Sequence, residues 1–189
     1  MAALHAYDVL DTEAEAEFDD LAALAARICD VPTALVSLVA EDRQWFKARV
    51  GLETAQTGRD VSFCARAMLG EGVMIVADTR QDPQFSDNGL VTGPPYVRFY
   101  AGAPLVTADG LPLGSLCVLD SAPRPQGLTP FQTNALEVLA RQVMNLLELR
   151  RALKARDESE QTTRRALEAS EYVGAWDWDV AADRGVADE

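Results

Sequence analysis

The sequence predicts an α+β fold, in which one antiparallel sheet carries helices from both ends of the chain on one face and loops on the other. Three observations predict it. Five short segments, most of them apolar, are predicted as strands and are separated by turn residues. An amphipathic segment precedes these strands, and a long segment without Gly or Pro follows them.

The first helix is predicted over residues 13–29, where apolar residues recur at helical spacing. They are Phe18, Leu21, Leu24, Ala25 and Ile28. Pro32 stops the helix, because proline disfavours the helical conformation of the residue before it. The apolar runs at 33–39 and 44–50 predict a β-hairpin around a polar turn.

The middle of the chain is predicted to alternate short elements with polar loops. Residues 53–60 are interpreted as a loop, after which Ser62 caps a short helix through Leu69. Residues 78–94 are rich in Asp, Asn, Gly and Pro, which indicates a long loop with one helical turn. The remaining strands are predicted at 73–77, 98–107 and 113–119, the last two joined by an Asp-Gly turn.

The C-terminal helix is predicted to begin near residue 129, with Thr129 as N-cap and Pro130 in its first position. It is predicted to begin as part of the domain core and to continue to about residue 170 as a mostly polar stalk with one leucine seam. Leucines follow one another in a seven-residue phase, which favours packing against a second copy of the chain and therefore a homodimer. These leucines are Leu139, Leu146, Leu153 and Leu167. The alternative is a solvated helix with charge pairs between successive turns.

The composition excludes several classes of function. With 17 basic and 30 acidic groups, the formal net charge of -13 repels phosphate backbones, so no nucleic-acid partner is expected. No apolar run approaches the length of a membrane span, and no signal peptide is recognisable, which predicts a cytoplasmic segment. Three separated cysteines and one histidine form no metal-ligand pattern and fit a reducing compartment.

Three stretches resemble a GAF domain of the bacterial sensor histidine kinase type. They are residues 31–47 with Asp-Arg-Gln-Trp-Phe-Lys, residues 59–64 with Arg-Asp-Val-Ser-Phe-Cys, and residues 98–120 with Phe-Tyr-Ala-Gly-Ala-Pro-Leu and Gly-Ser-Leu-Cys-Val-Leu-Asp. The resemblance implies a GAF-like sheet of five or six strands with terminal helices on one face. It also implies a small ligand bound between sheet and loops, and dimerisation through the terminal helices.

A second, shorter resemblance concerns the end of the chain. Gly-x-Trp-x-Trp-Asp, beginning at Gly174, is similar to the entry of a PAS domain. The predicted organisation is a GAF domain over 1–150, a helical linker over 150–170 and the truncated start of a PAS domain over 171–189. Such a chain is expected to come from a sensor histidine kinase or a diguanylate cyclase, with an output domain further downstream.

Catalysis by this chain itself is not expected. The only histidine, His5, precedes the first predicted helix, and no Gly-rich nucleotide loop is present, which argues against a kinase. A catalytic triad would also have to use His5. Ala65 follows Cys64 where bilin-binding GAF domains usually carry histidine, so covalent bilin attachment is not expected. The cyclic-nucleotide signature of phosphodiesterase GAF domains is absent, and no cofactor is required by the sequence.

The candidate ligand-binding residues lie at strand ends and in loops, where a rigid scaffold presents side chains. They are Phe63, Cys64, Asp78, Phe85, Arg98, Tyr100 and Asp120. Arg98 could bind an anionic ligand. The structural alternative is that Arg98 pairs with Asp60 or Asp78.

The cysteines admit a functional and a structural interpretation. Cys64 lies at a predicted helix start, where the local field lowers a thiol pKa and favours the reactive thiolate. A redox sensor, or an enzyme similar to the GAF-type free methionine sulfoxide reductases, is therefore the alternative to a binding module. In the structural interpretation, Cys64 and Cys117 are small buried apolar residues. The leading hypothesis is a regulatory sensory module that relays ligand occupancy through its C-terminal helix.

Overall fold

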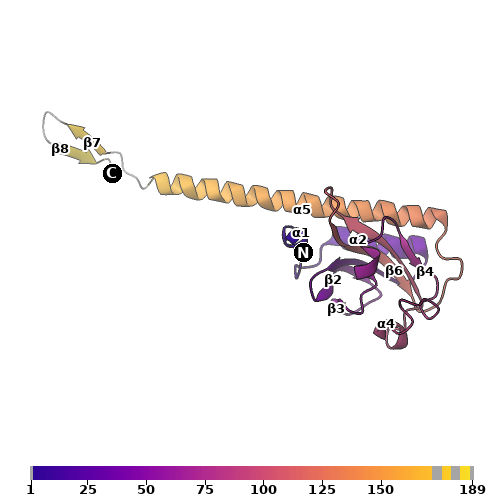
Figure 1. Ribbon diagram of the computed structural model, residues 1–189. Coiled ribbons are helices and arrows are strands. Elements are labelled where there is room, and N and C mark those ends of the chain that lie inside the picture. The colour runs from indigo at the N-terminus through magenta and orange to yellow at the C-terminus, as the bar shows by residue number, and fades with distance from the viewer. Residues whose placement is uncertain (1, 172–175, 180–183, 188–189) are drawn as a thin grey trace. The chain divides into compact units, whose positions relative to one another are not determined.

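A six-stranded antiparallel sheet forms the centre of the first of two compact units, Met1–Leu149 and Arg150–Glu189 (Figure 1). The computed structural model describes residues 2–171, 176–179 and 184–187. The strand order is β3-β2-β1-β6-β5-β4. The strands are β1 (Thr33–Val39), β2 (Arg43–Val50), β3 (Gln56–Gly58), β4 (Met74–Val76), β5 (Phe99–Val106) and β6 (Pro112–Asp120). The helices of this unit are α1 (Ala2–His5), α2 (Ala16–Cys29), α3 (Cys64–Ala67), α4 (Gly89–Thr92) and the first part of α5 (Pro130–Glu171). The predicted α+β class is confirmed.

Strand β3 was not predicted, because its residues are polar and small. It occupies one edge of the sheet and pairs only with β2, with Arg43 opposite Gly58. The interpretation of 53–60 as a loop was therefore wrong at 56–58. The predicted helix from Ser62 through Leu69 is also shorter, since α3 spans Cys64–Ala67. Ser62 nevertheless acts near its start, where its hydroxyl accepts a hydrogen bond from the Ala65 amide at 3.0 Å.

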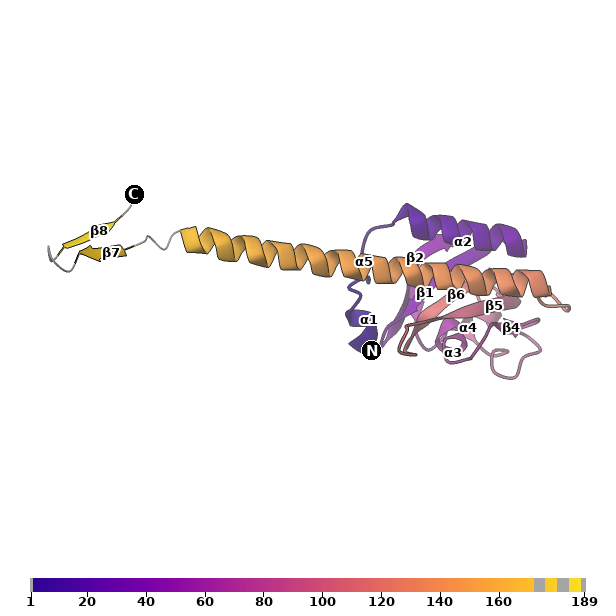
Figure 2. The same cartoon turned by 90° about the horizontal axis from the view of Figure 1, so that it is seen from above.

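Both faces of the sheet are covered, which explains why its central strands are apolar at nearly every position. Helix α2 and the first part of α5 cover one face (Figure 2). The core beneath them includes Phe18, Val36, Leu116 and Leu136. Helices α3 and α4 and the long loops cover the other face, above a second core. The sheet therefore has a helix side and a loop side.

The start of α5 is fixed by a reciprocal cap. The backbone amide of Gln132 donates a hydrogen bond to the Thr129 hydroxyl at 3.2 Å. In return, the side-chain carbonyl oxygen of Gln132 accepts one from the backbone amide of Thr129 at 3.0 Å. This capping box satisfies two amides that the first helical turn leaves without helical partners. The predicted N-cap at Thr129 is confirmed.

The leucine repeat of α5 begins as part of the domain's own core. Leu139 is buried, and Leu146 packs half-buried against the same core. Leu153 is 52% exposed, and the side chain of Leu167 lies outside the described residues. The prediction that the helix begins as domain core is confirmed, and pairing of its later part with a second copy stays a prediction.

The second unit contains the rest of α5 and a two-stranded hairpin, β7 (Trp176–Asp179) and β8 (Arg184–Ala187). In this part of α5, Arg156 pairs with Glu160 at 2.7 Å and Lys154 with Glu158 at 3.9 Å, each one helical turn apart. Strand β7 lies within the segment predicted to begin a PAS domain, which stays a prediction. Residues 172–175 and 180–183 of that segment lie outside the described residues.

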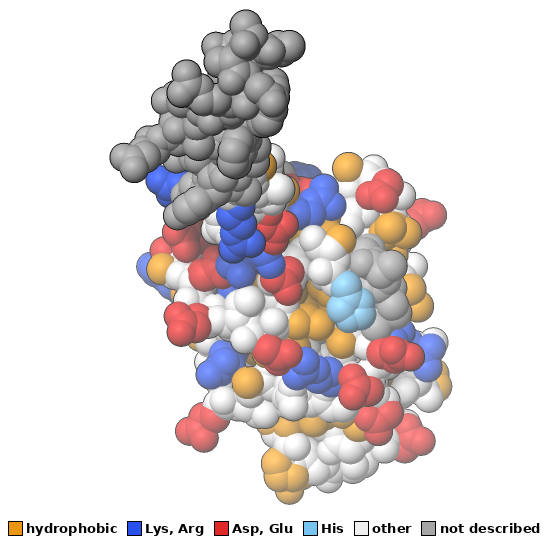
Figure 3. All heavy atoms as spheres, turned by 90° about the vertical axis from the view of Figure 1, so that its left-hand side faces the viewer, with side chains coloured by type: hydrophobic (Ala, Val, Ile, Leu, Met, Phe, Trp, Pro, Cys, Tyr) orange, Lys and Arg blue, Asp and Glu red, His pale blue; other side chains and the backbone are white. Residues whose placement is uncertain are grey.

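The surface is mixed in charge. On the face drawn in Figure 3, acidic side chains lie among the basic ones. Within the part of the chain that the structure describes, no helix combines the length and the apolar character that crossing a bilayer requires.

Candidate ligand cavity

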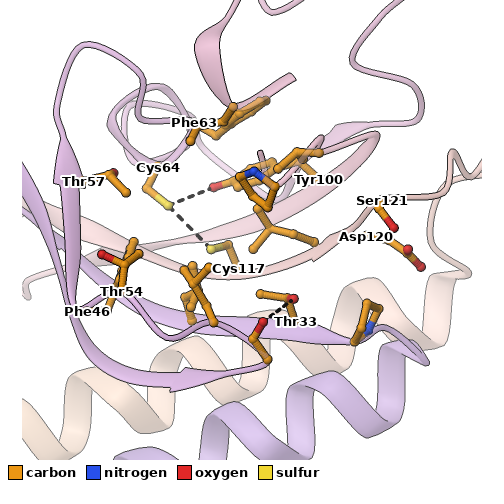
Figure 4. Close-up of a pocket in the computed structure, with 18 of the residues that line it drawn as sticks. Thr33, Phe46, Thr54, Thr57, Phe63, Cys64, Tyr100, Cys117, Asp120 and Ser121 are labelled. Carbon is orange, nitrogen blue, oxygen red and sulfur yellow. Dashed lines mark hydrogen bonds between the residues drawn. The ribbon is translucent and has the colours of Figure 1, made fainter. Parts of the chain in front are cut away.

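A cavity of about 530 Å³ lies on the loop side of the sheet (Figure 4). Strands β1 and β2, helix α3 and the ends of β5 and β6 supply most of its walls, and the segment before β5 supplies the rest. The lining residues are Pro32, Thr33, Leu35, Gln44, Phe46, Gly51, Leu52, Thr54, Thr57, Phe63, Cys64, Leu90, Pro94, Pro95, Val97, Tyr100, Cys117, Leu119, Asp120 and Ser121. The walls are thus mainly apolar, with a few polar groups.

Three aromatic rings form a stack on one side of the cavity. The Phe63 ring lies 4.4 Å from that of Phe85 and 5.1 Å from that of Tyr100, measured between centroids. Phe63 and Tyr100 line the cavity, whereas Phe85 is outside its lining and supports Phe63 from behind. The stack packs Phe63, the residue before α3, against both Phe85 and Tyr100.

Two thiols meet at the floor of the cavity. The Sγ atoms of Cys64 on α3 and Cys117 on β6 are 3.5 Å apart. The Tyr100 hydroxyl donates to Cys64 Sγ at 3.4 Å and lies 3.2 Å from the Ser115 hydroxyl. Figure 4 shows the side chains of Cys64, Cys117 and Tyr100 converging on one point.

The two thiols differ in acidity. Hydrogen bonding from Cys117 lowers the pKa of Cys64 to about 6, although burial acts in the opposite direction. Hydrogen bonds from hydroxyl groups, including that of Tyr100, add to the lowering. Burial raises the pKa of Cys117 well above its usual value. In this pair Cys64 is the thiol that ionises first.

Gly102 makes the room that the Tyr100 ring occupies. It lies on β5 opposite Cys117, and a Cβ atom added there would lie 2.8 Å from Cζ of Tyr100 and closer still to its oxygen. An isolated glycine within a strand indicates such a close approach. That signal could have pointed to Gly102 from the sequence, where it stands between two alanines in an apolar run.

A buried amide orders the polar wall of the cavity. Gln44 is 4% exposed, and its carbonyl oxygen accepts hydrogen bonds from Ser37 at 3.2 Å and Ser62 at 2.6 Å. Its amide nitrogen donates to Thr57 at 2.6 Å. The amide therefore joins β1, β2, β3 and the start of α3, and it holds the Thr57 hydroxyl at the cavity wall.

The charge of Arg98 is neutralised away from the cavity. Its guanidinium donates two hydrogen bonds to the Asp78 carboxylate, at 2.9 and 2.8 Å. The guanidinium holds the pKa of Asp78 down, at about 2. Neither residue lines the cavity. Of the two interpretations of Arg98, the structure shows the ion pair, and the partner is Asp78 rather than Asp60.

The predicted site residues divide into two groups. Phe63, Cys64, Tyr100 and Asp120 line the cavity, whereas Asp78, Phe85 and Arg98 do not. Sequence reasoning missed most of the wall contributed by β1, β2 and the segments beside them. The missed polar residues are Thr33, Gln44, Thr54, Thr57 and Ser121. None of these residues carried a signal that could be recognised in the sequence, since Gln44 lies near the start of a strand that also contains Lys47 and Arg49.

Comparison with known proteins gives a family and a fold. The GAF domain model matches residues 13–147. A cyclic di-GMP phosphodiesterase from Pseudomonas aeruginosa is 47% identical over 150 residues, which is 79% of this chain. The chain spans only 25% of the length of that relative.

Solved structures share the fold at low sequence identity. The blue-light-absorbing PixJ GAF domain of Thermosynechococcus elongatus is 18% identical, with a TM-score of 0.60 over 76% of this chain and 90% of that one. The free methionine-R-sulfoxide reductase of Neisseria meningitidis is also 18% identical, with a TM-score of 0.58 over 78% of this chain and 87% of that one.

Proposed function

The chain belongs to the GAF domain family, and on that premise we propose that it is the regulatory domain of a cyclic di-GMP signalling protein. In this proposal it binds an uncharged or cationic, largely apolar small molecule and passes the signal through α5. The observation that carries the proposal is the cavity on the loop side of the sheet. Its volume of about 530 Å³ and its mainly apolar walls match those of small-molecule sites.

The charges around the cavity limit the ligand class. Asp120 is the charged residue of the lining, and none of the lining residues is Lys, Arg or His. A phosphate group in an apolar cavity would lack the cationic partner that offsets its desolvation. The ligand we propose is therefore not cyclic di-GMP or another nucleotide. The hydroxyls of Thr54 and Thr57, and the carboxylate of Asp120, would orient it.

The cellular context is inferred from the relative. The Pseudomonas aeruginosa protein is a cyclic di-GMP phosphodiesterase, and the identity of 47% extends over most of this chain. This supports a parent protein in cyclic di-GMP turnover in preference to a histidine kinase. The part of the parent beyond this chain would perform the catalysis.

A short route joins the cavity to α5. Strand β6 contributes Cys117, Leu119 and Asp120 to the cavity and leads through residues 121–129 into the helix. In that connection, Arg124 donates hydrogen bonds to the carbonyls of Cys29, at 2.6 Å, and Asp30 at the end of α2. If the connection can adopt two positions, a ligand that binds the domain more tightly in one of them would favour that position and so shift α5 relative to the sheet.

Native mass spectrometry of the chain purified from cell extract tests the ligand. We expect a small-molecule adduct that is lost in Leu119→Trp, because the larger side chain occupies the cavity. Val106→Trp, on an exposed site of the same sheet, is the matched control and should retain the adduct. Empty wild-type protein, or an adduct that survives Leu119→Trp, would contradict the proposal.

The relay requires a second copy of the chain against α5. Sedimentation of the whole chain and of a chain ending at Leu149 tests it, because the shorter chain keeps the compact first unit. We expect a dimer that weakens on truncation. A strict monomer in both cases would exclude a relay through paired helices.

The thiol pair favours a second candidate, a reductase of free methionine sulfoxide. The specific observation is that Cys64 and Cys117 both line the cavity and touch each other. Turnover of free methionine sulfoxide with a thiol reductant, lost in Cys64→Ala, would support it. Absence of turnover by the fully reduced chain would contradict this second candidate and leave the ligand-binding regulatory domain as the proposed function.

A further inference from the structure

We infer that Cys64 and Cys117 are a modification site, at which a hydroperoxide closes a reversible disulfide across the cavity floor. The site goes beyond the proposed function, because it needs no knowledge of the cavity's ligand. It rests on three observations: the contact between the two sulfur atoms, their common opening into the cavity, and the hydroxyl that faces Cys64.

The geometry brings the sulfur atoms close to bonding distance. They lie 3.5 Å apart, and a disulfide requires about 2.05 Å, so they must approach by about 1.5 Å. Cys117 is fixed in a central strand, with neighbours on both sides. Cys64 is instead the first residue of a helix of only 4 residues, between the buried side chains of Phe63 and Met68. We expect the approach to be made by α3, because β6 is hydrogen-bonded to a strand on each side whereas α3 belongs to no sheet.

Access to the pair runs through the cavity. The side chains are buried from the outer surface, with exposures of 3% for Cys64 and 0% for Cys117, yet both line the cavity wall. A hydroperoxide is small enough to enter a space of about 530 Å³. Bulky thiols and protein reductants are too large to reach the floor, which favours a small reductant for the reverse step.

The surroundings assign different roles to the two thiols. Cys64 accepts a hydrogen bond from the Tyr100 hydroxyl and is the more acidic thiol, so it supplies the nucleophilic thiolate. Cys117 stays protonated, because burial raises its pKa. It is the resolving thiol.

The reaction balances with a hydroperoxide as oxidant. The Cys64 thiolate attacks one peroxide oxygen, the O–O bond breaks, and Cys64 becomes a sulfenic acid while the other oxygen leaves as hydroxide or alkoxide. Cys117 sulfur then attacks Cys64 sulfur, the S–O bond breaks, and water leaves with the Cys117 proton. In total, two thiols lose two electrons and two protons, and the peroxide is reduced by two electrons.

The third cysteine provides an internal comparison. Cys29 lies on α2 in the helix-side core, and burial raises its pKa to about 11. It is as buried as the other two, at 1% exposed, but it does not line the cavity. Burial alone therefore does not distinguish Cys64, whereas access from the cavity and the facing hydroxyl do.

Closure of the disulfide would change both the floor of the cavity and the side that is formed by Phe63 and its aromatic stack. The bond would tie α3 to β6, which is also the strand that leads to α5. It would draw Phe63 and its aromatic stack toward the sheet. Oxidation would thereby alter ligand binding and the position of the helix in one step.

Non-reducing peptide mapping of the whole native chain tests the inference. After treatment with hydrogen peroxide and alkylation of the remaining thiols, we expect a peptide linked through Cys64 and Cys117, with Cys29 alkylated. In a parallel sample, dithiothreitol added after the peroxide and before alkylation should leave all three cysteines as free thiols. Before oxidation, Cys64 should be alkylated by a small reagent at least about tenfold faster than Cys29.

Two variants separate the chemistry from misfolding. Cys29→Ala is the matched control and should form the link at the wild-type rate. Cys117→Ser removes the resolving thiol but keeps a hydrogen-bond donor beside Cys64, and it should stop at the sulfenic acid of Cys64, which dimedone captures. The inference is overturned if wild-type Cys64 is oxidised to sulfinic acid while Cys117 stays free, or if the link appears only in urea-unfolded chain. A link formed by free methionine sulfoxide and not by peroxide would overturn it in favour of the reductase. The small-molecule adduct is measured separately, so either proposal can fail alone.

Discussion

The two faces of the sheet are built from alternate residues of the same strands, yet they are packed differently. On β6, Leu116 and Val118 enter the helix-side core, whereas Cys117 enters the loop-side core. The helix-side core is lined by α2 and α5, which are long enough to fill it with aliphatic side chains. The loop side is covered by helices of 4 residues and by loops, and it retains a cavity of about 530 Å³.

The two faces differ in how their buried groups are held. The buried polar groups that line or flank the cavity, among them Gln44, Ser62 and Tyr100, are held by side-chain hydrogen bonds. Such networks specify positions but depend on every member being satisfied. A close-packed aliphatic core instead resists any loss of volume. We therefore expect substitutions on the helix side mainly to lower stability, and substitutions on the loop side also to disturb the hydrogen-bond network.

The largest effect on stability is expected from the helix side. Leu136→Ala, at a fully buried position of α5, should lower the free energy of unfolding by about 3 kcal/mol, because it leaves a cavity in the core. Urea denaturation measures the loss. Leu111→Ala, at a position 45% exposed, is the matched control and should change stability by less than about 0.5 kcal/mol. Similar losses in both variants would show that α5 does not close this core.

A smaller loss with a chemical consequence is expected on the loop side. Gly102→Ala forces the buried Tyr100 ring to move, which should lower the free energy of unfolding by about 2 kcal/mol. The movement also withdraws the Tyr100 hydroxyl from Cys64. The pKa of Cys64 should then rise, which a pH series of alkylation rates would detect. Gly72→Ala adds the same methyl group in open space, 4.0 Å from the nearest atom, and should leave both quantities unchanged. An unchanged alkylation profile in Gly102→Ala would remove Tyr100 from the activation of Cys64.

The elements that bury apolar side chains could be predicted from the sequence, because burial imposes a period. The hairpin of β1 and β2 and the last two strands lie close to their predicted bounds for this reason. Strand β3 escaped prediction since it lies at the edge and buries little. The seven-residue phase of the α5 leucines does not identify their partner, because such a phase fits the chain's own sheet as well as a second helix.

The site was harder to predict, because it depends on contacts between distant segments. Cys64 and Cys117 are 53 positions apart, and neither lies in a motif that predicts contact with the other. Arg98 and Asp78 were recognised as a possible pair, but only the structure shows that their charges cancel outside the cavity. Phe63 and Tyr100, two of the predicted ligand-binding residues, line the cavity because strand ends and helix starts meet at this side of the sheet; that they bind a ligand stays a prediction.

The ion pair behind the cavity should make stability depend on pH. Asp78 has a folded pKa of about 2 against an ordinary value of 3.8, so its contribution is complete above pH 4 and is lost as the pH falls toward 2. Asp78→Asn should therefore be less stable than wild type at pH 7, by on the order of 1 kcal/mol, and equal to it near pH 2. Unfolding curves at both pH values measure this. Asp11→Asn removes a more exposed pair with Arg43 and should change less. A deficit that persists at pH 2 would mean that packing, not charge, holds Asp78.

The smallest effect on stability is expected on the outer side of α5, where the consequence should instead be for assembly. Leu149 is 55% exposed, so Leu149→Glu should change the free energy of unfolding of the single chain by less than about 0.5 kcal/mol. If α5 pairs with a second copy through this side, the buried carboxylate should weaken the dimer by at least about tenfold in sedimentation equilibrium. Leu111→Glu introduces the same charge at an exposed leucine between β5 and β6, away from the helix, and should leave association unchanged. Equal association of both variants and wild type would restrict α5 to its intramolecular role on the helix side of the sheet.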